Sequence, residues 1–232
     1  EVSTKIFKWV EHSDPFTYVG IHWVDLFCYY LDLQPLSLYA VGIKKRLKEE
    51  FGKDTFDATQ VVVVHSGGTV VSYENNWITP PDFEGPVNQE SHVIAALGKV
   101  ESDSQYRGLR YWIENKGSRT SNVHFFRQVQ RPDGSHVCIG YGKDSLVDCI
   151  EKVYRVKFLG ADARQLEGTY PDAASQQIPV AIIEAARACM LRNWSYIEQG
   201  RPALCSASLA GGRIELVDPL ADSREVLWEG AS

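Results

Sequence analysis

The chain has 232 residues and a mass of 26.1 kDa, about one and a half domains of the usual ~150 residues, so we expect one large domain or a domain with an appendage. Its composition, with 44% hydrophobic and 23% charged residues, excludes collagenous and disordered classes, and no apolar run approaches the roughly 20 residues that span a bilayer. The net charge of −6 is opposite in sign to a nucleic-acid-binding surface, so neither nucleic acid nor a membrane is expected as a partner.

The N-terminal third of the sequence predicts a helix between strands. Residues 1–9 have strand character, and Asp14-Pro15 is typical of a helix N-cap followed by proline at the first helical position. The predicted helix runs from about Pro15 to Leu31 and ends before Gln34-Pro35. The next expected elements are a strand at 36–43, a short charged helix or turn at 44–51, and a hairpin of strands 59–65 and 69–77 around Ser66-Gly67-Gly68.

The rest of the chain changes from strands to helices. Strands are expected at 89–95, 99–102, 109–114, 122–130 and 136–141, the last two joined by the turn Pro132-Asp133-Gly134. Asp144 is expected to cap a helix that ends near Gly160, and residues 173–197 predict a long helix with Pro179 in its first turns. Residues from 200 onward are expected to be irregular, with short strands at 213–217 and 225–228. Strands followed by helices, without repeated alternation, predict an α+β fold.

Cysteines and histidines give no sign of a disulfide framework or a metal site. The five cysteines are odd in number, widely spaced and without a Cys-x-x-Cys pair, and the six histidines show no His-x-x-x-His spacing. A metal hydrolase is therefore disfavoured, and we expect a reducing, cytoplasmic location. The chain starts at Glu1 and no secretory signal follows, so we expect that it begins inside a longer gene product.

No glycine-rich loop of the kind that cradles a nucleotide phosphate can be identified. A Gly-x-Gly-x-x-Gly run follows none of the predicted strands. The segment 140–145 resembles a phosphate loop only superficially, because Asp144 separates Lys143 from Ser145. We interpret its glycines as a hairpin exit and a helix cap.

The first predicted helix carries the strongest candidate site. Tyr18, His22, Asp25 and Tyr29 recur at helical spacing and share one face of an otherwise apolar helix. Histidine is the side chain best suited to proton transfer near neutral pH, and Asp25 could orient the ring of His22. The structural alternative is that these two residues satisfy each other, or a neighbouring strand, in the core. Gly20 would permit close approach of another backbone or of a ligand.

The same helix resembles a known enzyme family. Gly20-Ile21-His22-Trp23-Val24-Asp25-Leu26 is similar to the Gly-x-His-x-x-Asp signature of the glucose-fructose oxidoreductase and inositol dehydrogenase family, Gfo/Idh/MocA. Further agreement, in the order of that family's C-terminal half, comes from Tyr39-Ala40-Val41-Gly42, Asp54-Thr55-Phe56-Asp57-Ala58, Asn76-Trp77-Ile78-Thr79-Pro80 and Gly98-Lys99-Val100-Glu101-Ser102-Asp103. The resemblance covers roughly residues 1–198.

The resemblance implies a fold and a domain organisation. Family members join an NAD(P)-binding Rossmann domain to a C-terminal α+β domain, a large open and mainly antiparallel sheet with helices packed on one face. Residues 1–198 would form this second domain, residues 199–232 a tail with short strands packed on it, and the Rossmann domain with its Glu-Lys-Pro segment has no counterpart here. NAD or NADP would bind in the full-length parent and not to this chain alone.

The resemblance also implies site residues. His22 matches the histidine usually assigned to acid-base work on the alcohol, and Tyr18 stands where the family often has Asp. Trp77, Gln89 and Arg107 lie in matching sheet regions and could line a sugar pocket, and their alternatives are a core tryptophan, a solvated strand residue and a surface ion pair.

Two functions from different classes follow. The first is the substrate-binding half of an NAD(P)-dependent dehydrogenase that oxidises a secondary hydroxyl of a sugar, cyclitol or related polyol, with His22 catalytic and Tyr18, Asp25, Trp77, Gln89 and Arg107 binding substrate. The second is a non-catalytic module in which the sheet binds a ligand or forms a homo-oligomer through the face that carries Val70, Ser72, Glu74 and Asn76.

Overall fold

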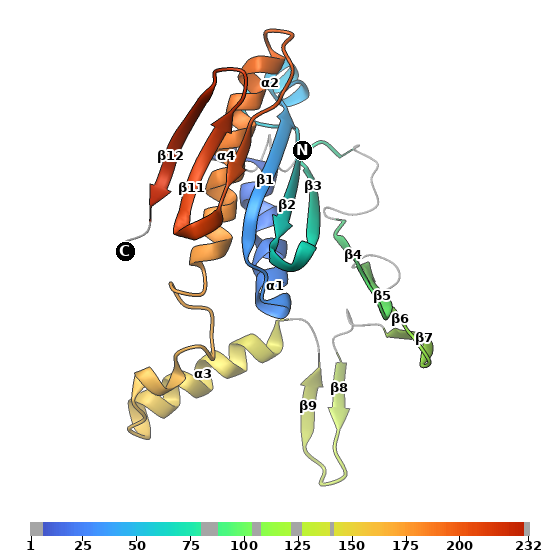
Figure 1. The fold of residues 1–232 in the computed structure, drawn as a ribbon. Helices are drawn as coiled ribbons and strands as arrows, with labels where there is room; N and C mark the ends of the chain where they lie inside the picture. Colours follow the sequence, from blue (N-terminus) through green and yellow to red (C-terminus); the bar gives the residue numbers. More distant parts are fainter. Residues whose placement is uncertain (1–6, 80–87, 104–107, 122–126, 140–141, 230–232) are drawn as a thin grey trace. The chain divides into compact units, whose positions relative to one another are not determined.

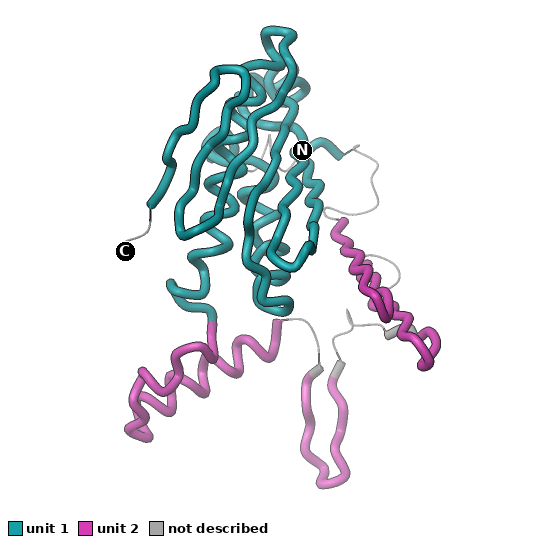
Figure 2. Tube along the Cα trace, viewed as in Figure 1, with its two compact units in different colours: residues 1–83, 171–232 teal, residues 84–170 magenta. Residues whose placement is uncertain are grey.

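The computed structural model describes residues 7–79, 88–103, 108–121, 127–139 and 142–229. The chain divides into two compact units (Figure 2): unit 1 combines residues 1–83 with 171–232, and unit 2 comprises residues 84–170. Unit 1 carries His22 and nearly all the buried side chains.

Unit 1 is built on a six-stranded antiparallel sheet in the order β12-β11-β10-β1-β2-β3 (Figure 1). Its strands are β1 (Pro35–Ile43), β2 (Ala58–His65), β3 (Val70–Asn76), β10 (Ser206–Ser208), β11 (Arg213–Asp218) and β12 (Ser223–Glu229). The predicted hairpin is confirmed: β2 and β3 pair in register around the turn η4 (Ser66–Gly68), where Gly67 and Gly68 adopt positive φ. The strands expected at 213–217 and 225–228 are confirmed as β11 and β12, whereas β10 was not predicted.

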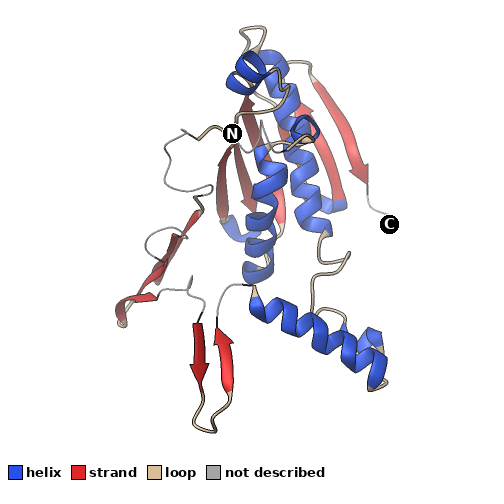
Figure 3. Cartoon of the chain, turned by 180° about the vertical axis from the view of Figure 1, so that it is seen from behind, coloured by secondary structure: helices blue, strands red, loops and turns tan. Residues whose placement is uncertain are grey.

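Helices cover one face of this sheet (Figure 3). Helix α4 (Gln177–Ile197) packs along β1, β10 and β11, and α1 (Ile21–Leu31) packs against α4. The long helix is confirmed with Pro179 in its first turn, although residues 173–176 form a turn rather than helix. The core between the layers is formed by fully buried apolar residues of both: Phe16, Val24, Ala40, Val61, Val63, Ile182, Ala186 and Met190.

The helix predicted from Pro15 to Leu31 is confirmed, with one irregularity. Its first part, η3 (Phe16–Gly20), is a π-helix that continues into α1. Asp14 acts as the predicted cap, since its Oδ1 accepts the Thr17 amide at 2.9 Å. Of the strand expected over residues 1–9, residues 1–6 lie outside the described residues, and the prediction is wrong for 7–9, which form a turn leading into η2 (Val10–His12).

The opposite face of the sheet of unit 1 is exposed. The residues Val70, Ser72, Glu74 and Asn76 of β3 alternate outward as predicted, and Tyr39, Ile43 and Val64 are exposed on the neighbouring strands. The sheet thus has one covered face and one open face.

Helix α2 (Arg46–Phe51), within the predicted charged segment, follows β1.

Unit 2 contains a four-stranded antiparallel sheet in the order β4-β5-β6-β7, a hairpin of β8 and β9, a helix α3 and a short 3-10 turn η5. The element bounds are β4 (Glu90–Ala95), β5 (Gly98–Asp103), β6 (Gly108–Ile113), β7 (Gly117–Ser121), β8 (Arg127–Gln130), β9 (His136–Ile139), α3 (Lys143–Phe158) and η5 (Ala163–Leu166). Strand β7 was not predicted, and residues 122–126 of the strand expected at 122–130 lie outside the described residues. Asp144 does not cap α3. The cap position is Gly142 at φ 78°, and Asp144 pairs with Lys143 in the first turn.

Across both units every strand pairing of the described residues is antiparallel. The predicted class is therefore confirmed: an α+β fold with an open antiparallel sheet and helices on one face.

Candidate functional site

His22 lies on the outer face of α1, one residue after the helix begins. Its side chain is exposed, and within the described ranges it makes no hydrogen bond, so the ring can accept a proton from a bound molecule. Two predicted neighbours on this face, Tyr18 and Tyr29, are exposed as well. The predicted face is therefore open to solvent and is not part of the core.

Asp25 is hydrogen-bonded to Gln176 and not to His22. Its Oδ1 accepts a hydrogen bond of 2.7 Å from Nε2 of Gln176, the residue before α4. The side chain is half-buried between the two helices. This bond joins α1 to the start of α4 and helps to set the position of the helix that carries His22.

Four aromatic rings gather at the start of this helix, and we call them the aromatic cluster: Phe7, Trp9, Tyr18 and Trp77. Phe7 and Trp9 stack with ring centroids 4.6 Å apart, and Trp9 lies 4.8 Å from Tyr18. Trp77 meets Tyr18 and Trp9 edge to face at 6.2 and 6.5 Å. Tyr18 and Trp77 were predicted substrate-binding residues, and the structure brings them together.

Phe7 and Trp9 were not among the predicted residues. Trp77 is separated from them by about 70 positions, and no periodicity links a turn at the N-terminus to the end of β3. A signal that could have found them is the density of aromatic residues between Phe7 and Tyr18.

Gly20 sets how closely the helix approaches the sheet. A Cβ at this position would overlap the ring of Phe16 and would lie 3.1 Å from Oδ1 of Asn75 on β3. The expected close neighbour was another backbone or a ligand, whereas the atoms next to Gly20 belong to two side chains, Phe16 of the same helix and Asn75 of β3. A π-helix at this point is a feature often found at functional sites, since it displaces the following residues from the regular helical phase.

Other residues that carry the family resemblance make packing contacts and hydrogen bonds that stabilise the fold of unit 1. The ring of Phe56 fills the space that a side chain at Gly42 would need. The buried carboxylate of Asp57 accepts the amides of Lys45, Arg46 and Leu47 at 2.6–3.0 Å and so caps α2. The carbonyl of Asp57 also accepts the amide of Trp77 at 2.9 Å, which places that ring at the aromatic cluster.

The two remaining predicted residues belong to unit 2. Gln89 directly precedes β4 in unit 2, where its side chain is half-buried and has an interaction partner. Arg107 lies outside the described residues. Their predicted roles remain predictions.

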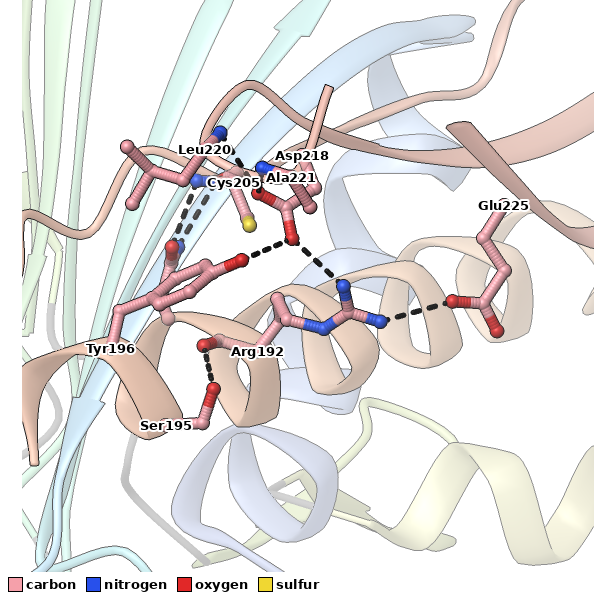
Figure 4. Close-up of polar contacts among 9 residues, drawn as sticks. Arg192, Ser195, Tyr196, Cys205, Asp218, Leu220, Ala221 and Glu225 are labelled. Carbon is pink, nitrogen blue, oxygen red and sulfur yellow. Dashed lines mark hydrogen bonds and ion pairs between the residues drawn. The ribbon is translucent and has the colours of Figure 1, made fainter. Parts of the chain in front are cut away.

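A separate, polar cluster lies at the covered face of the sheet (Figure 4). Asp218, at the end of β11 and 1% exposed, accepts hydrogen bonds from Tyr196 Oη at 2.6 Å and from Arg192 Nη1 at 2.7 Å. Burial disfavours its charged form, but the bonds from Tyr196, Arg192 and the Ala221 amide outweigh this and lower the pKa of Asp218 from 3.8 to about 2. The cluster is fully partnered and links α4 to β11, so we assign it a structural role.

Neither a metal-ligand group nor a membrane-spanning helix is present in the part of the chain that the structure describes. Its His, Cys, Asp and Glu side chains form no group of three that could hold a metal ion. No described helix is both long enough and apolar enough to cross a bilayer.

The sequence matches no protein-family model and no curated protein sequence. Solved structures do match. An oxidoreductase from Sinorhizobium meliloti is similar with a TM-score of 0.55 at 14% identity, covering 78% of this chain and 51% of its own. A Thermotoga maritima structure described as an oxidoreductase matches at 0.52 and 15% identity, covering 78% of this chain and 46% of its own.

The third match is UDP-N-acetylglucosamine 3-dehydrogenase from Acidithiobacillus ferrooxidans, with a TM-score of 0.50 at 14% identity, covering 76% of this chain and 47% of its own. The present chain therefore spans about half the length of these proteins. The matches confirm the resemblance to Gfo/Idh/MocA-type oxidoreductases at the level of the fold.

Proposed function

We propose that this chain is the substrate-binding half of an NAD(P)-dependent oxidoreductase that oxidises a secondary hydroxyl of a sugar, cyclitol or related polyol. The observation that carries the proposal is the exposed His22 on α1, beside an aromatic cluster, in a domain with an oxidoreductase fold. The name of one similar protein, UDP-N-acetylglucosamine 3-dehydrogenase, denotes the same reaction class on a sugar.

The described strands do not form a Rossmann dinucleotide cradle. A Rossmann cradle requires a parallel strand-helix-strand unit with a glycine-rich turn, whereas the described strand pairs are antiparallel. A nicotinamide cofactor, NAD or NADP, would be held by another part of the parent protein. When bound there, it would supply the hydride acceptor that no side chain can provide.

The chain itself contributes the base and the substrate surface. In the proposed site, Nδ1 or Nε2 of His22 accepts the proton of the hydroxyl as the carbon is oxidised. Asp25 positions the helix through Gln176. Tyr18 and Trp77 contact the substrate, and Gln89 and Arg107 remain candidates for its hydroxyls. The parent is expected to act in the cytoplasm.

Replacing the base in the full-length parent tests this proposal. We expect His22→Ala to lower kcat/KM on the best of a panel of sugars and cyclitols about 10²–10⁴-fold. Tyr30→Ala is a matched control, because Tyr30 is 71% exposed on the same helix and lies outside the proposed site. A His22→Ala enzyme with near-normal kcat/KM would refute the assigned role.

A second candidate, self-association through the sheet, is favoured by the open face. Val64 and Val70 face each other across β2 and β3 and are 37% and 57% exposed, next to the exposed Tyr39 of β1. We expect light scattering to show a dimer or higher oligomer of the chain that Val64→Asp shifts to monomer, while Tyr30→Asp does not. A strict monomer at all concentrations would rule this function out.

A further inference from the structure

The aromatic cluster presents ring surface to solvent. Trp9 is 38% exposed and Tyr18 41%, whereas Phe7 and Trp77 are half-buried beneath and beside them. Trp9 and Tyr18 meet at an interplanar angle of 50°, and Tyr18 and Trp77 at 62°. The rings therefore meet at steep angles and form a surface that is partly open to solvent.

The chemistry of this surface is apolar with polar edges. Its four side chains carry no charge, and Tyr18 and Trp9 add one O–H and one N–H donor at the ring edges. These four rings supply no counter-ion of their own for a carboxylate or a phosphate. Such a surface suits a molecule with one apolar face and hydroxyl groups around its rim.

We propose that the aromatic cluster is a stacking surface for the C–H face of an uncharged, ring-shaped polyol, a pyranose or a cyclitol, and that it discriminates against open-chain polyols. The inference rests on the proposed function for the class of substrate, and it adds Phe7 and Trp9 to the binding residues. In a six-membered chair, alternate axial bonds point to the same side, so a ring with mostly equatorial hydroxyls presents faces of axial C–H bonds, whereas an open chain has no fixed face of this kind and loses more rotational freedom on binding.

Isothermal titration of the 232-residue chain tests this proposal without cofactor or turnover. The probes are methyl β-D-glucopyranoside and myo-inositol, with D-glucitol as the open-chain control. We expect at least one ring polyol to bind about tenfold more tightly than D-glucitol. Trp9→Ala and Trp77→Ala should each weaken that binding about threefold to tenfold.

Two further variants separate stacking from folding. Trp228→Ala removes a tryptophan that is 51% exposed on β12, outside the cluster, and should leave the Kd unchanged. Tyr18→Phe keeps the ring and should retain most of the affinity that Tyr18→Ala loses. All variants are compared at equal helix content by circular dichroism.

Several results would overturn the stacking surface: D-glucitol binding as tightly as the ring polyols, an unchanged Kd in folded Trp9→Ala and Trp77→Ala variants, or no measurable binding of either ring polyol. Because the readout is binding by the chain alone, such failure leaves the role of His22 to be judged by the parent's activity. Conversely, an active His22→Ala parent would not affect the stacking result.

Discussion

Gly20 decides how deeply the helix that carries His22 can sit on the sheet. Its backbone is helical, at φ −59° and ψ −32°, so alanine would gain about 1 kcal/mol of helix propensity. The added Cβ would, however, overlap the buried ring of Phe16 and approach Asn75, and overpacking of this kind costs typically 1–3 kcal/mol. We expect the steric term to win, so that Gly20→Ala lowers the free energy of unfolding by about 1–2 kcal/mol in urea denaturation.

A double-mutant cycle with Phe16→Leu checks the cause. Removing part of the ring should recover some of the loss, so the two changes together should cost less than the sum of the single changes. Full additivity, or a stabilised Gly20→Ala variant, would show that Phe16 does not restrict this position.

At the scale of single elements, α2 depends on a carboxylate that lies outside it. The six-residue helix is too short to be stable by itself, and Asp57 supplies three hydrogen bonds to its first amides while also offsetting the helix dipole. Asp57→Ala would leave these amides without their partner, and we expect a loss of about 2–4 kcal/mol in thermal or urea unfolding.

Asp57→Asn is the matched control for this prediction. The amide keeps one acceptor oxygen but loses the charge, so its cost should be about half that of alanine. An Asp57→Ala variant as stable as the unmodified chain would mean that the cap contributes nothing to stability. The resemblance of residues 54–58 to the family would then need another explanation.

The cluster around Asp218 predicts a dependence of stability on pH. Its pKa is about 2 in the folded chain, against 3.8 as the ordinary value, so the folded state holds fewer protons than the unfolded state between these values. The contribution of Asp218 is therefore complete above about pH 4 and is lost as the pH falls towards 2. The difference in Tm between the unmodified chain and Asp218→Asn should shrink over this window, and a constant difference would contradict the assignment.

Sequence patterns predicted elements where local signals were strong and failed where pairing is distant. The run of β-branched residues in 59–65 and the glycines that follow it specify a hairpin by themselves. The short polar strands β7 and β10 carry no such pattern, because β10 is a strand only through its pairing with β1 and β11. At α3, Asp144 gave a cap signal, but the left-handed Gly142 already turns the chain into the helix.

The site followed the same rule at the scale of the whole molecule. His22, Tyr18 and Asp25 could be placed on one helix face, because their spacing is local. The aromatic cluster could not be predicted in this way. Trp77 follows β2 and β3 in the sequence, and the hydrogen bond from its amide to the carbonyl of Asp57 places its ring at the cluster. The link between Asp25 and Gln176 joins residues about 150 positions apart, and no periodic pattern encodes such a contact.

The distribution of burial predicts that the two units differ in local stability. In unit 1, Val61 and Val63 of β2 are fully buried, as is Ala185 of α4, whereas the buried side chain among the described residues of unit 2 is Leu166. Amide exchange is slow where opening requires loss of a packed core and fast where few buried contacts hold a strand. We expect the amides of Val61 and Val63 to exchange at least about a hundredfold more slowly than those of β5, after correction for intrinsic rates. Hydrogen exchange followed by mass spectrometry measures this directly. Equal protection of β2 and β5 would mean that another surface covers the strands of unit 2.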